Sequence, residues 1–376
     1  MKITAIEVID LRAPRPSVET YDGTYVGCLI RVKTDAGIEG IAEVDSSPEL
    51  MKAAIHARES LTWPPLGPLF IGQDPMAAPE ALWDRAYEKT LHNGRRGVLI
   101  HALSGIDIAL WDLRGKALGK SVAELLGARK RERVRAYATL VRLGKTADTV
   151  RAVIDAGLAK GTQAIKLCSD GAWRHDRDLV ERVFRAARAH VGKAMPIMFD
   201  AYGVWKSVEE VEPHWPLFQD IGIEWLEAPL PMDDLDGYRR LSGRGIPVTG
   251  GDMGLTTRFE FEIMAKLGGV EILQPDATYV GGLTEMRRTA ALAKALGRRI
   301  IPHGYKSNLL LATNLAFLAQ HDTEEWLEYS IAPSPLRWEM TREALPIGAD
   351  GRVAVPTGPG LGVTLNEETV ATYRVG

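Results

Sequence analysis

The sequence predicts an α/β protein in which a (β/α)8 TIM-type barrel is joined to a smaller α+β capping domain. Three observations lead to this fold class. The chain of 376 residues is too long for one ordinary compact core. Beyond its first third, short apolar strands alternate with helical stretches. Six of these strands are expected to end on an ionisable residue, at intervals of 24 to 27 residues, which suits one strand, one helix and two loops. These residues are Asp200, Glu227, Asp252, Asp276, His303 and Glu328.

The first region, residues 1–126, is predicted to form the capping domain. From Ile3 to Val44 apolar and polar residues alternate, and the stretch KTDAGIEG supplies the Asp and Gly of a tight turn. We therefore expect an antiparallel meander. Between Pro48 and Leu126 the apolar spacing becomes helical, most clearly from Gly97 to Gly119, where a glycine marks the expected helix end. About three helices are expected to cover the small sheet.

The second region, residues 127–345, is predicted to form the barrel. Apolar segments at Arg133–Leu140 and Ala164–Cys168 add two strands to the six above and complete eight, and amphipathic helices such as Asp176–Val191 lie between strands. Residues 346–376 are rich in turns and are expected to return to the capping domain. Because parallel strands of a barrel end at one mouth, the six ionisable residues would share a single cavity.

Composition limits the classes of function. The chain is 45% hydrophobic and 25% charged, with a net charge of -3 and a pI near 6.3, so nucleic acid is not an expected partner. Cys28 and Cys168 are its two cysteines, too few for a disulfide framework. No apolar run approaches the length of a membrane span, and the first residues lack the apolar core of a signal peptide. We expect no membrane partner and a cytoplasmic location.

Three successive predicted strands end on the carboxylates of Asp200, Glu227 and Asp252. Like charges this close repel one another unless a cation compensates, and oxygen ligands that leave room for water and substrate suit Mg²⁺. Any one of the three could instead cap a helix or pair with a nearby cation. Three carboxylates in phase favour a magnesium site.

Asp276 and His303, on the next two strands, predict a general base. A carboxylate bonded to one imidazole nitrogen fixes the tautomer and raises the basicity of the other nitrogen. Lys166 is expected to close the strand before Asp200, and Glu328 is expected to close the last strand. The lysine could balance a substrate carboxylate or move a proton, and the glutamate could hydrogen-bond a developing enolate if it were held protonated. Surface salt bridges are the alternative for both.

The ordered motifs of this chain resemble those of the enolase superfamily, in its mandelate racemase and muconate lactonizing enzyme branch. They are FDAYGVW, WLEAPL, VTGGD, QPDATYVGGLTE, PHG and WLEYS, with GIDIALWDLRGKALGKSVAELLG before the barrel and PTGPGLGV in the tail. The resemblance covers essentially the whole chain. It implies removal of the proton alpha to a carboxylate, with Mg²⁺ stabilising the enolate. By resemblance, the metal ligands are Asp200, Glu227 and Asp252, the base is His303 with its partner Asp276, and the electrophilic residues are Lys166 and Glu328.

Two positions depart from the family pattern. Many relatives carry a Lys-any-Lys motif after the second strand, where this chain has KLC, so Cys168 occupies the second lysine position. A racemase needs a base on each face of the alpha carbon, and a cysteine against apolar neighbours is a poor base. Lys166 could still act as an acid or base. Asp252 stands where glutamate is usual, which could alter ligation or admit a water molecule.

A single clear base favours elimination over racemisation. His303 would remove the alpha proton of a hydroxy acid, the beta hydroxyl would leave, and the enol would become a 2-keto-3-deoxy acid. The sequence therefore predicts a hydro-lyase acting on an aldonate or aldarate, a small carboxylate substrate. The capping segments Tyr21–Tyr25 and Asp45–Glu49 are expected to close the mouth and read the substrate. Polar residues that could bind it, or simply face solvent, are Tyr202, Tyr25, Lys306, Arg174 and His175.

Other functions stay open. An epimerase, racemase or cycloisomerase of the same superfamily shares the first proton transfer but loses no water. A metal-dependent barrel hydrolase would carry a His-any-His pair after the first strand, and the stretch RAYATL has none. A non-catalytic binding barrel would usually have lost part of the acid, base and metal set, of which only the second lysine is missing here. Resemblance alone predicts a homo-oligomer.

Overall fold

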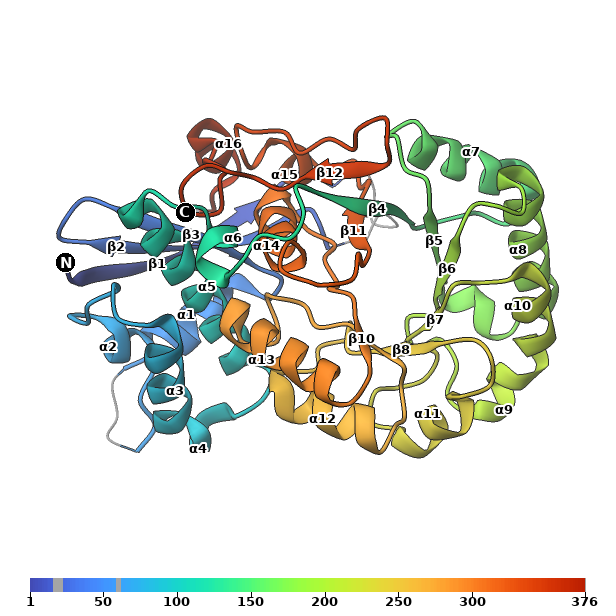
Figure 1. Ribbon diagram of the computed structural model, residues 1–376, viewed down its shortest axis with the longest axis horizontal. Helices are drawn as coiled ribbons and strands as arrows, with labels where there is room; N and C mark the ends of the chain where they lie inside the picture. Colours follow the sequence, from blue (N-terminus) through green and yellow to red (C-terminus); the bar gives the residue numbers. More distant parts are fainter. Residues whose placement is uncertain (16–22, 59–61, 376) are drawn as a thin grey trace.

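The small antiparallel sheet at the N-terminal end confirms the predicted meander. The computed structural model describes residues 1–15, 23–58 and 62–375. Its first sheet has the order β1 (Ile3–Arg12), β2 (Val26–Thr34) and β3 (Glu39–Val44), all antiparallel. Figure 1 shows this sheet at the left of the molecule, beside the ring of barrel strands.

Helix α5 (Val98–Leu118) packs against this sheet and agrees with the segment predicted from Gly97 to Gly119. Gly119 ends the helix in the left-handed conformation with φ of 64°. Gly40 allows α5 to approach β3, because a Cβ at this position would lie 1.9 Å from the carbonyl oxygen of Ala109. The other capping helices are α1 (Pro48–His56), α2 (Gly67–Phe70), α3 (Pro79–Lys89), α4 (Leu91–Gly94) and α6 (Val122–Leu126).

The second sheet contains the eight parallel strands that the spacing predicted. Neighbouring strands follow the order β10-β9-β8-β7-β6-β5-β4-β11, and the short β12 (Arg352–Ala354) pairs antiparallel with β4. The fold class is therefore confirmed as a TIM-like barrel with a capping domain. The parallel strands are β4 (Arg133–Leu140), β5 (Ile165–Cys168), β6 (Ile197–Asp200), β7 (Leu226–Glu227), β8 (Val248–Gly250), β9 (Ile272–Leu273), β10 (Arg299–Ile300) and β11 (Leu327–Ser330).

Helices connect the barrel strands and lie outside the ring of strands in Figure 1. The side chain of Asp176 caps α8 (Arg177–Val191) by accepting from the Leu179 amide, and α8 coincides with the amphipathic stretch predicted at Asp176–Val191. The other connections contain α7 (Ala147–Leu158), η1 (Gly171–Arg174), α9 (Val208–Val211), η2 (Glu212–His214), α10 (Trp215–Ile221), α11 (Leu235–Leu241), α12 (Thr257–Lys266), α13 (Gly282–Ala295) and α14 (Asn308–Leu318).

Aromatic side chains fill part of the barrel interior. Tyr137 is fully buried, with its ring edge-on to Trp225 at 5.5 Å and to Trp326 at 6.5 Å between centroids. The Nζ of Lys166 lies 5.5 Å from the centre of the Tyr137 ring. The residues at the mouth therefore rest on a packed aromatic layer.

The C-terminal tail contacts both parts of the molecule. After α15 (Pro335–Glu339), β12 pairs with β4, whereas α16 (Glu367–Tyr373) packs near β1. The backbone amide of Val375 then donates to the carbonyl of Asp10 at 2.9 Å. The boundaries at 126/127 and 345/346 stay predictions. Among the described residues, no helix is both long and apolar enough to cross a membrane.

Candidate active site

Three buried carboxylates meet at the mouth of the barrel. Asp200 and Glu227 are the last residues of β6 and β7, and Asp252 lies two residues beyond β8. One ligand oxygen from each lies within 4.8 Å of the other two. The strand ends thus bring together residues that are 25 or more positions apart in sequence.

This cluster fits a divalent cation. Asp252 Oδ1 is buried and has no hydrogen-bond partner among the described residues. Burial and then the charge of Glu227 raise the pKa of Asp200 to about 6, and burial with both neighbouring carboxylates raises the pKa of Asp252 well above its usual value. The cluster therefore holds more negative charge than its surroundings compensate, and a bound cation would relieve that repulsion.

Lys166 is the cation that touches this cluster from β5. Its Nζ donates to Glu227 Oε1 at 2.5 Å and lies 2.9 Å from Glu328 Oε1 and 3.7 Å from Asp200 Oδ2. Burial on its own would lower the pKa of Lys166, but Glu227 and Glu328 outweigh it and raise the pKa well above its usual value. Lys166 is thus charged and held among three carboxylates.

Glu227 is fixed by a second set of donors. Trp225 Nε1 donates to Glu227 Oε2 at 2.9 Å, and Gln274 Nε2 donates to the same oxygen at 2.8 Å. Thr249 donates to the side-chain carbonyl of Gln274, which orients the amide. Glu227 is consequently held in one orientation before any ligand binds.

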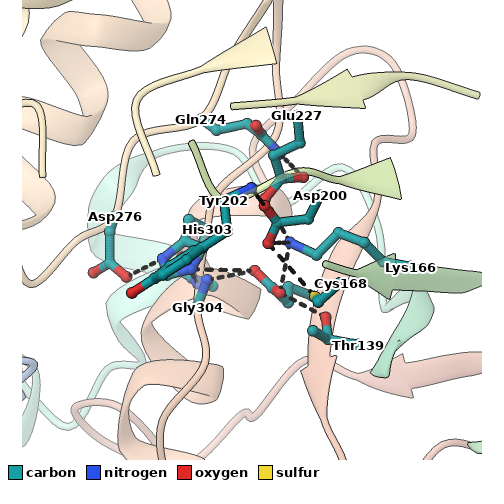
Figure 2. Close-up of polar contacts among 12 residues, drawn as sticks. Thr139, Lys166, Cys168, Asp200, Tyr202, Glu227, Gln274, Asp276, His303 and Gly304 are labelled. Atoms are coloured by element: carbon teal, nitrogen blue, oxygen red, sulfur yellow. Dashed lines mark hydrogen bonds and ion pairs between the residues drawn. The ribbon is translucent and has the colours of Figure 1, made fainter. Parts of the chain in front are cut away.

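His303 and Asp276 form the predicted pair. They lie three residues beyond β10 and β9, and His303 Nδ1 is 2.7 Å from Asp276 Oδ2. The amide and hydroxyl of Thr278 donate to the other oxygen of Asp276, both at 2.6 Å. Figure 2 shows His303 and Lys166 reaching towards the carboxylate cluster from opposite sides. Burial would lower the pKa of His303, but Glu328 and Asp276 outweigh burial and raise it to about 10.

Glu328 links the two sides of the mouth but does not end its strand, because β11 continues to Ser330. Its Oε1 accepts from Thr139 at 2.6 Å, and its Oε2 accepts from the Gly304 amide at 2.9 Å. Burial would raise the pKa of Glu328, but Lys166 and His303 lower it to about 2. The predicted role of Glu328 as a donor to an enolate requires a retained proton, which the neighbouring Lys166 and His303 disfavour, and that role stays a prediction.

Cys168 and Tyr202 flank Asp200. The Cys168 thiol lies 3.5 Å from Asp200 Oδ2 and donates to it, and burial followed by Asp200 raises the pKa of this thiol well above its usual value. The Tyr202 amide donates to Asp200 Oδ1 at 2.8 Å, and its side chain is 64% exposed. Tyr202 thus lies beside the cluster, where a ligand could reach its ring.

Three other residues were predicted to contact substrate: Arg174, His175 and Tyr25. Their surroundings in the structure differ from one another. Arg174, in η1, makes a two-pronged ion pair with Glu210 at 3.0 and 2.8 Å, and His175 next to it is exposed. Tyr25 is buried in the turn directly before β2. Residues 21 and 22 of the predicted segment Tyr21–Tyr25 lie outside the described residues.

Lys306 is also buried, and its contacts are with protein groups. Its Nζ donates to the carbonyl oxygens of Gly23 at 2.6 Å and Val26 at 3.1 Å, and it lies 2.8 Å from Asp45 Oδ1. All of these partners lie in the N-terminal capping sheet or in the loops beside it. Lys306 therefore binds the capping segments, and its predicted contact with substrate stays a prediction.

Comparison with known proteins agrees with this geometry. Residues 146–369 match the family described as enolase C-terminal domain-like, and residues 4–127 match the mandelate racemase / muconate lactonizing enzyme N-terminal domain. The chain belongs to the enolase superfamily. It falls in the mandelate racemase and muconate lactonizing enzyme branch of that superfamily.

Individual relatives of this superfamily carry different activities in their names. The chain is 32% identical over 392 residues to a D-galactarolactone cycloisomerase of Agrobacterium fabrum, covering 100% of this chain and 99% of that one. It is 33% identical over 312 residues to an arabinonate dehydratase of Saccharolobus solfataricus, covering 82% and 81%. The structure of a 3,6-anhydro-D-galactonate cycloisomerase from Zobellia galactanivorans superposes with a TM-score of 0.89 at 26% identity and covers both chains completely.

Several residues of this enolase-superfamily site escaped sequence reasoning. Gln274 precedes Asp276 by two positions in the motif QPD, and Thr139 lies near the end of β4. Because both residues lie at or near the end of a predicted strand, the sequence could have indicated that they face the mouth of the barrel. Trp225 is inside the barrel, where an indole ordinarily signals packing, so only the structure assigns its hydrogen bond to Glu227.

Proposed function

We propose that this protein is a Mg²⁺-dependent hydro-lyase that converts an aldonate or aldarate into a 2-keto-3-deoxy acid. The observation that carries the proposal is the asymmetry of the mouth: one oriented histidine on one side of the carboxylate cluster and a fully engaged lysine on the other. Membership of the enolase superfamily supports a carboxylate substrate. Beyond family membership, we propose the reaction, which is loss of water, the metal, which is Mg²⁺, and the substrate class, which is acid sugars.

His303 is the proposed base. Its Nδ1 is bound to Asp276, which in turn accepts two hydrogen bonds from Thr278, so the ring is held with Nε2 facing the mouth. Nε2 is 3.9 Å from Glu328 Oε2, the distance of a contact without a direct hydrogen bond. A neutral His303 could therefore take the alpha proton at Nε2.

Within residues 1–15, 23–58 and 62–375, the opposite side of the mouth supplies no second free base. Lys166 donates to Glu227 and lies against Glu328, and Cys168 donates its thiol proton to Asp200. Exchange of configuration at the alpha carbon needs proton transfer on both faces. A site with one free base favours elimination instead.

Asp200, Glu227 and Asp252 are the proposed Mg²⁺ ligands, on the strength of their spacing and the unpartnered oxygen of Asp252. When bound there, Mg²⁺ would stabilise the negative charge that develops on the substrate carboxylate as the alpha proton leaves. Lys166 orients Glu227 for this task and balances part of the charge. The added positive charge would also lower the pKa of His303 towards the range in which imidazole is neutral.

The proposed elimination balances as follows. His303 Nε2 takes the alpha proton, and the electron pair of the broken C–H bond forms a carbon–carbon double bond as the beta C–O bond breaks. The protonated His303 returns that proton to the departing hydroxyl group, which leaves as water. The resulting enol tautomerises to the 2-keto acid.

A cycloisomerase is the second candidate. Two of the proteins compared, each covering the whole chain, carry this name, whereas the arabinonate dehydratase covers 82% of it. Both reactions begin with proton removal by one base, so the geometry of His303 serves either. They differ in whether water is lost.

The deciding experiment is a screen of aldonic, aldaric and uronic acids and their lactones with Mg²⁺. Formation of 2-keto-3-deoxy products would be followed with semicarbazide, and His303→Asn would be assayed beside the wild type. A product that forms in the wild type and disappears in the variant supports the dehydratase. Isomerisation of a lactone without water loss supports the cycloisomerase, and turnover that survives the substitution contradicts the assigned base.

A further inference from the structure

The loop that carries His303 is tied to the capping domain by its next residues. Lys306 follows His303 by three positions, and its side chain is 6% exposed. Among the described residues, its side chain contacts two separate capping segments: the carbonyls of Gly23 and Val26 before and at the start of β2, and the carboxylate of Asp45 after β3. One ammonium group therefore joins both segments to the barrel.

Neighbouring contacts reinforce this junction. The amide and hydroxyl of Ser307 donate to Glu43 Oε2 at 3.0 and 2.6 Å. Glu43 is buried in β3, two residues before Asp45. The short stretch from Glu43 to Asp45 thus contacts two consecutive residues of the barrel loop. Removing the Lys306 contacts would leave the Ser307 contact in place.

Tyr279 connects the junction to the base. Its ring lies nearly parallel to that of His303, with centroids 6.4 Å apart, and 5.0 Å from the ring of His101 in α5. Burial, and after it the charge of Asp45, raise the pKa of Tyr279 well above its usual value, which reflects the nearness of the carboxylate. A displacement of Asp45 would therefore change the surroundings of Tyr279, whose ring lies against that of His303.

We propose that Lys306 is a positioning residue that holds both capping segments against the loop carrying His303, and that it thereby sets substrate affinity more than the rate of proton removal. This inference rests on the proposed function for its kinetic part only. Because Lys306 contacts both segments directly, a change at this residue would act on the substrate through the segments it holds.

Hydrogen exchange of single amides tests the junction without any substrate. The amide of Ala13 donates to the Tyr25 carbonyl at 2.9 Å, and the amide of Val26 donates to the Gly23 carbonyl at 3.4 Å. In Lys306→Met these two amides are expected to exchange at least about tenfold faster, because the segment loses its tie to the barrel. Lys306→Arg, which retains donors and charge, is expected to recover part of the protection.

Lys33→Met is the matched control. Lys33 also makes a capping-domain ion pair, with Glu7 at 2.7 Å, but it lies on β2 away from the mouth. This variant should exchange like the wild type. If Lys306→Met fails to fold, Asp45→Asn weakens the same junction while leaving both carbonyl contacts, and a smaller increase in the same direction is expected. Unchanged exchange in a folded variant overturns the proposal.

The predicted effect of Lys306 on substrate affinity is tested by steady-state kinetics, with the acid that the screen identifies as substrate. Lys306→Met is expected to raise KM about tenfold while kcat stays within about threefold, since the base and metal ligands are untouched. A loss confined to kcat overturns the positioning role. If the wild type acts on no acid, the proposed function fails by itself, and the junction is then judged on hydrogen exchange alone.

Discussion

The two sides of the barrel mouth hold their cationic groups in different ways. On one side His303 is fixed at Nδ1 by Asp276, and its Nε2 approaches a single carboxylate at 3.9 Å. On the other side Lys166 contacts Glu227 and Glu328 within 3 Å, and its neighbour Cys168 donates to Asp200. The first arrangement leaves a nitrogen free to move a proton. The second binds the lysine into the structure of the cluster.

The largest expected effect is on the histidine side. His303→Asn should lower exchange of the substrate alpha proton with solvent deuterium by about 10²- to 10⁴-fold, the usual contribution of a general base. The exchange is measured by proton NMR in D₂O. His190→Asn is the matched control, because His190 also pairs with an aspartate, Asp155, at 2.7 Å, but near the surface. If the alpha proton exchanged equally fast in the two variants, His303 would not be the base, and the two sides of the mouth would not differ as described.

Next in size is the effect of the third carboxylate. Asp252→Asn should lower Mg²⁺ affinity by about 100-fold or more, because loss of even a group behind a metal ligand typically costs 10- to 100-fold. Titration calorimetry of the metal-free protein measures the affinity, and chelator should abolish wild-type turnover. Asp35→Asn, in the capping hairpin, serves as the control. Wild-type affinity in Asp252→Asn would contradict the metal site.

On the lysine side the main effect is expected on stability. Lys166→Met leaves Glu227 and Glu328 buried without their cation, so the free energy of unfolding of the metal-free protein should fall by about 3–5 kcal/mol. Urea unfolding followed by circular dichroism measures it. Added Mg²⁺ should restore part of the loss by neutralising the same carboxylates. An unchanged midpoint would mean that Lys166 is not held as tightly as its contacts indicate.

The neighbouring cysteine should matter little for proton removal. Cys168→Ser keeps a donor to Asp200, and the rate of alpha-proton exchange should stay within about threefold, because burial keeps the thiol protonated. Exchange in D₂O measures the rate directly. A loss comparable to that of His303→Asn would place a second proton-transfer group on the lysine side.

The contacts of His303 can also be tested without a substitution, by following the titration of its ring. In the metal-free protein the pKa of His303 is raised to about 10, so its ion pairs stabilise the fold fully below the unfolded pKa near 6.5, and this contribution is lost as pH rises through about 10. Nitrogen-15 NMR of labelled histidine follows the imidazole. Mg²⁺ should shift the transition to lower pH, and a transition near 6.5 without metal would contradict the Asp276 and Glu328 contacts.

The positions of the functional groups followed from sequence to different degrees. Asp200 and Glu227 end their strands as predicted, because short parallel strands stop where the apolar run meets a charge. Glu328 was predicted to end the last strand, and this was wrong, because Tyr329 and Ser330 continue the pairing with β4. The surroundings of Lys306 could not be predicted, because its partners Gly23 and Asp45 lie more than 250 residues earlier in the chain.

The sequence by itself determined the class of fold, the ionisable groups of the mouth and the family. Strand and helix periods are local properties, and the barrel topology turns a regular interval of charges into one cluster. Only the tertiary structure decided which groups are already engaged: Lys166 lies among carboxylates, Glu328 is bound by Lys166, Thr139 and the Gly304 amide, and Lys306 is bound to the capping segments. These outcomes depend on distances of a few ångströms and on burial, which govern charge interactions and are set by packing among residues remote in the chain.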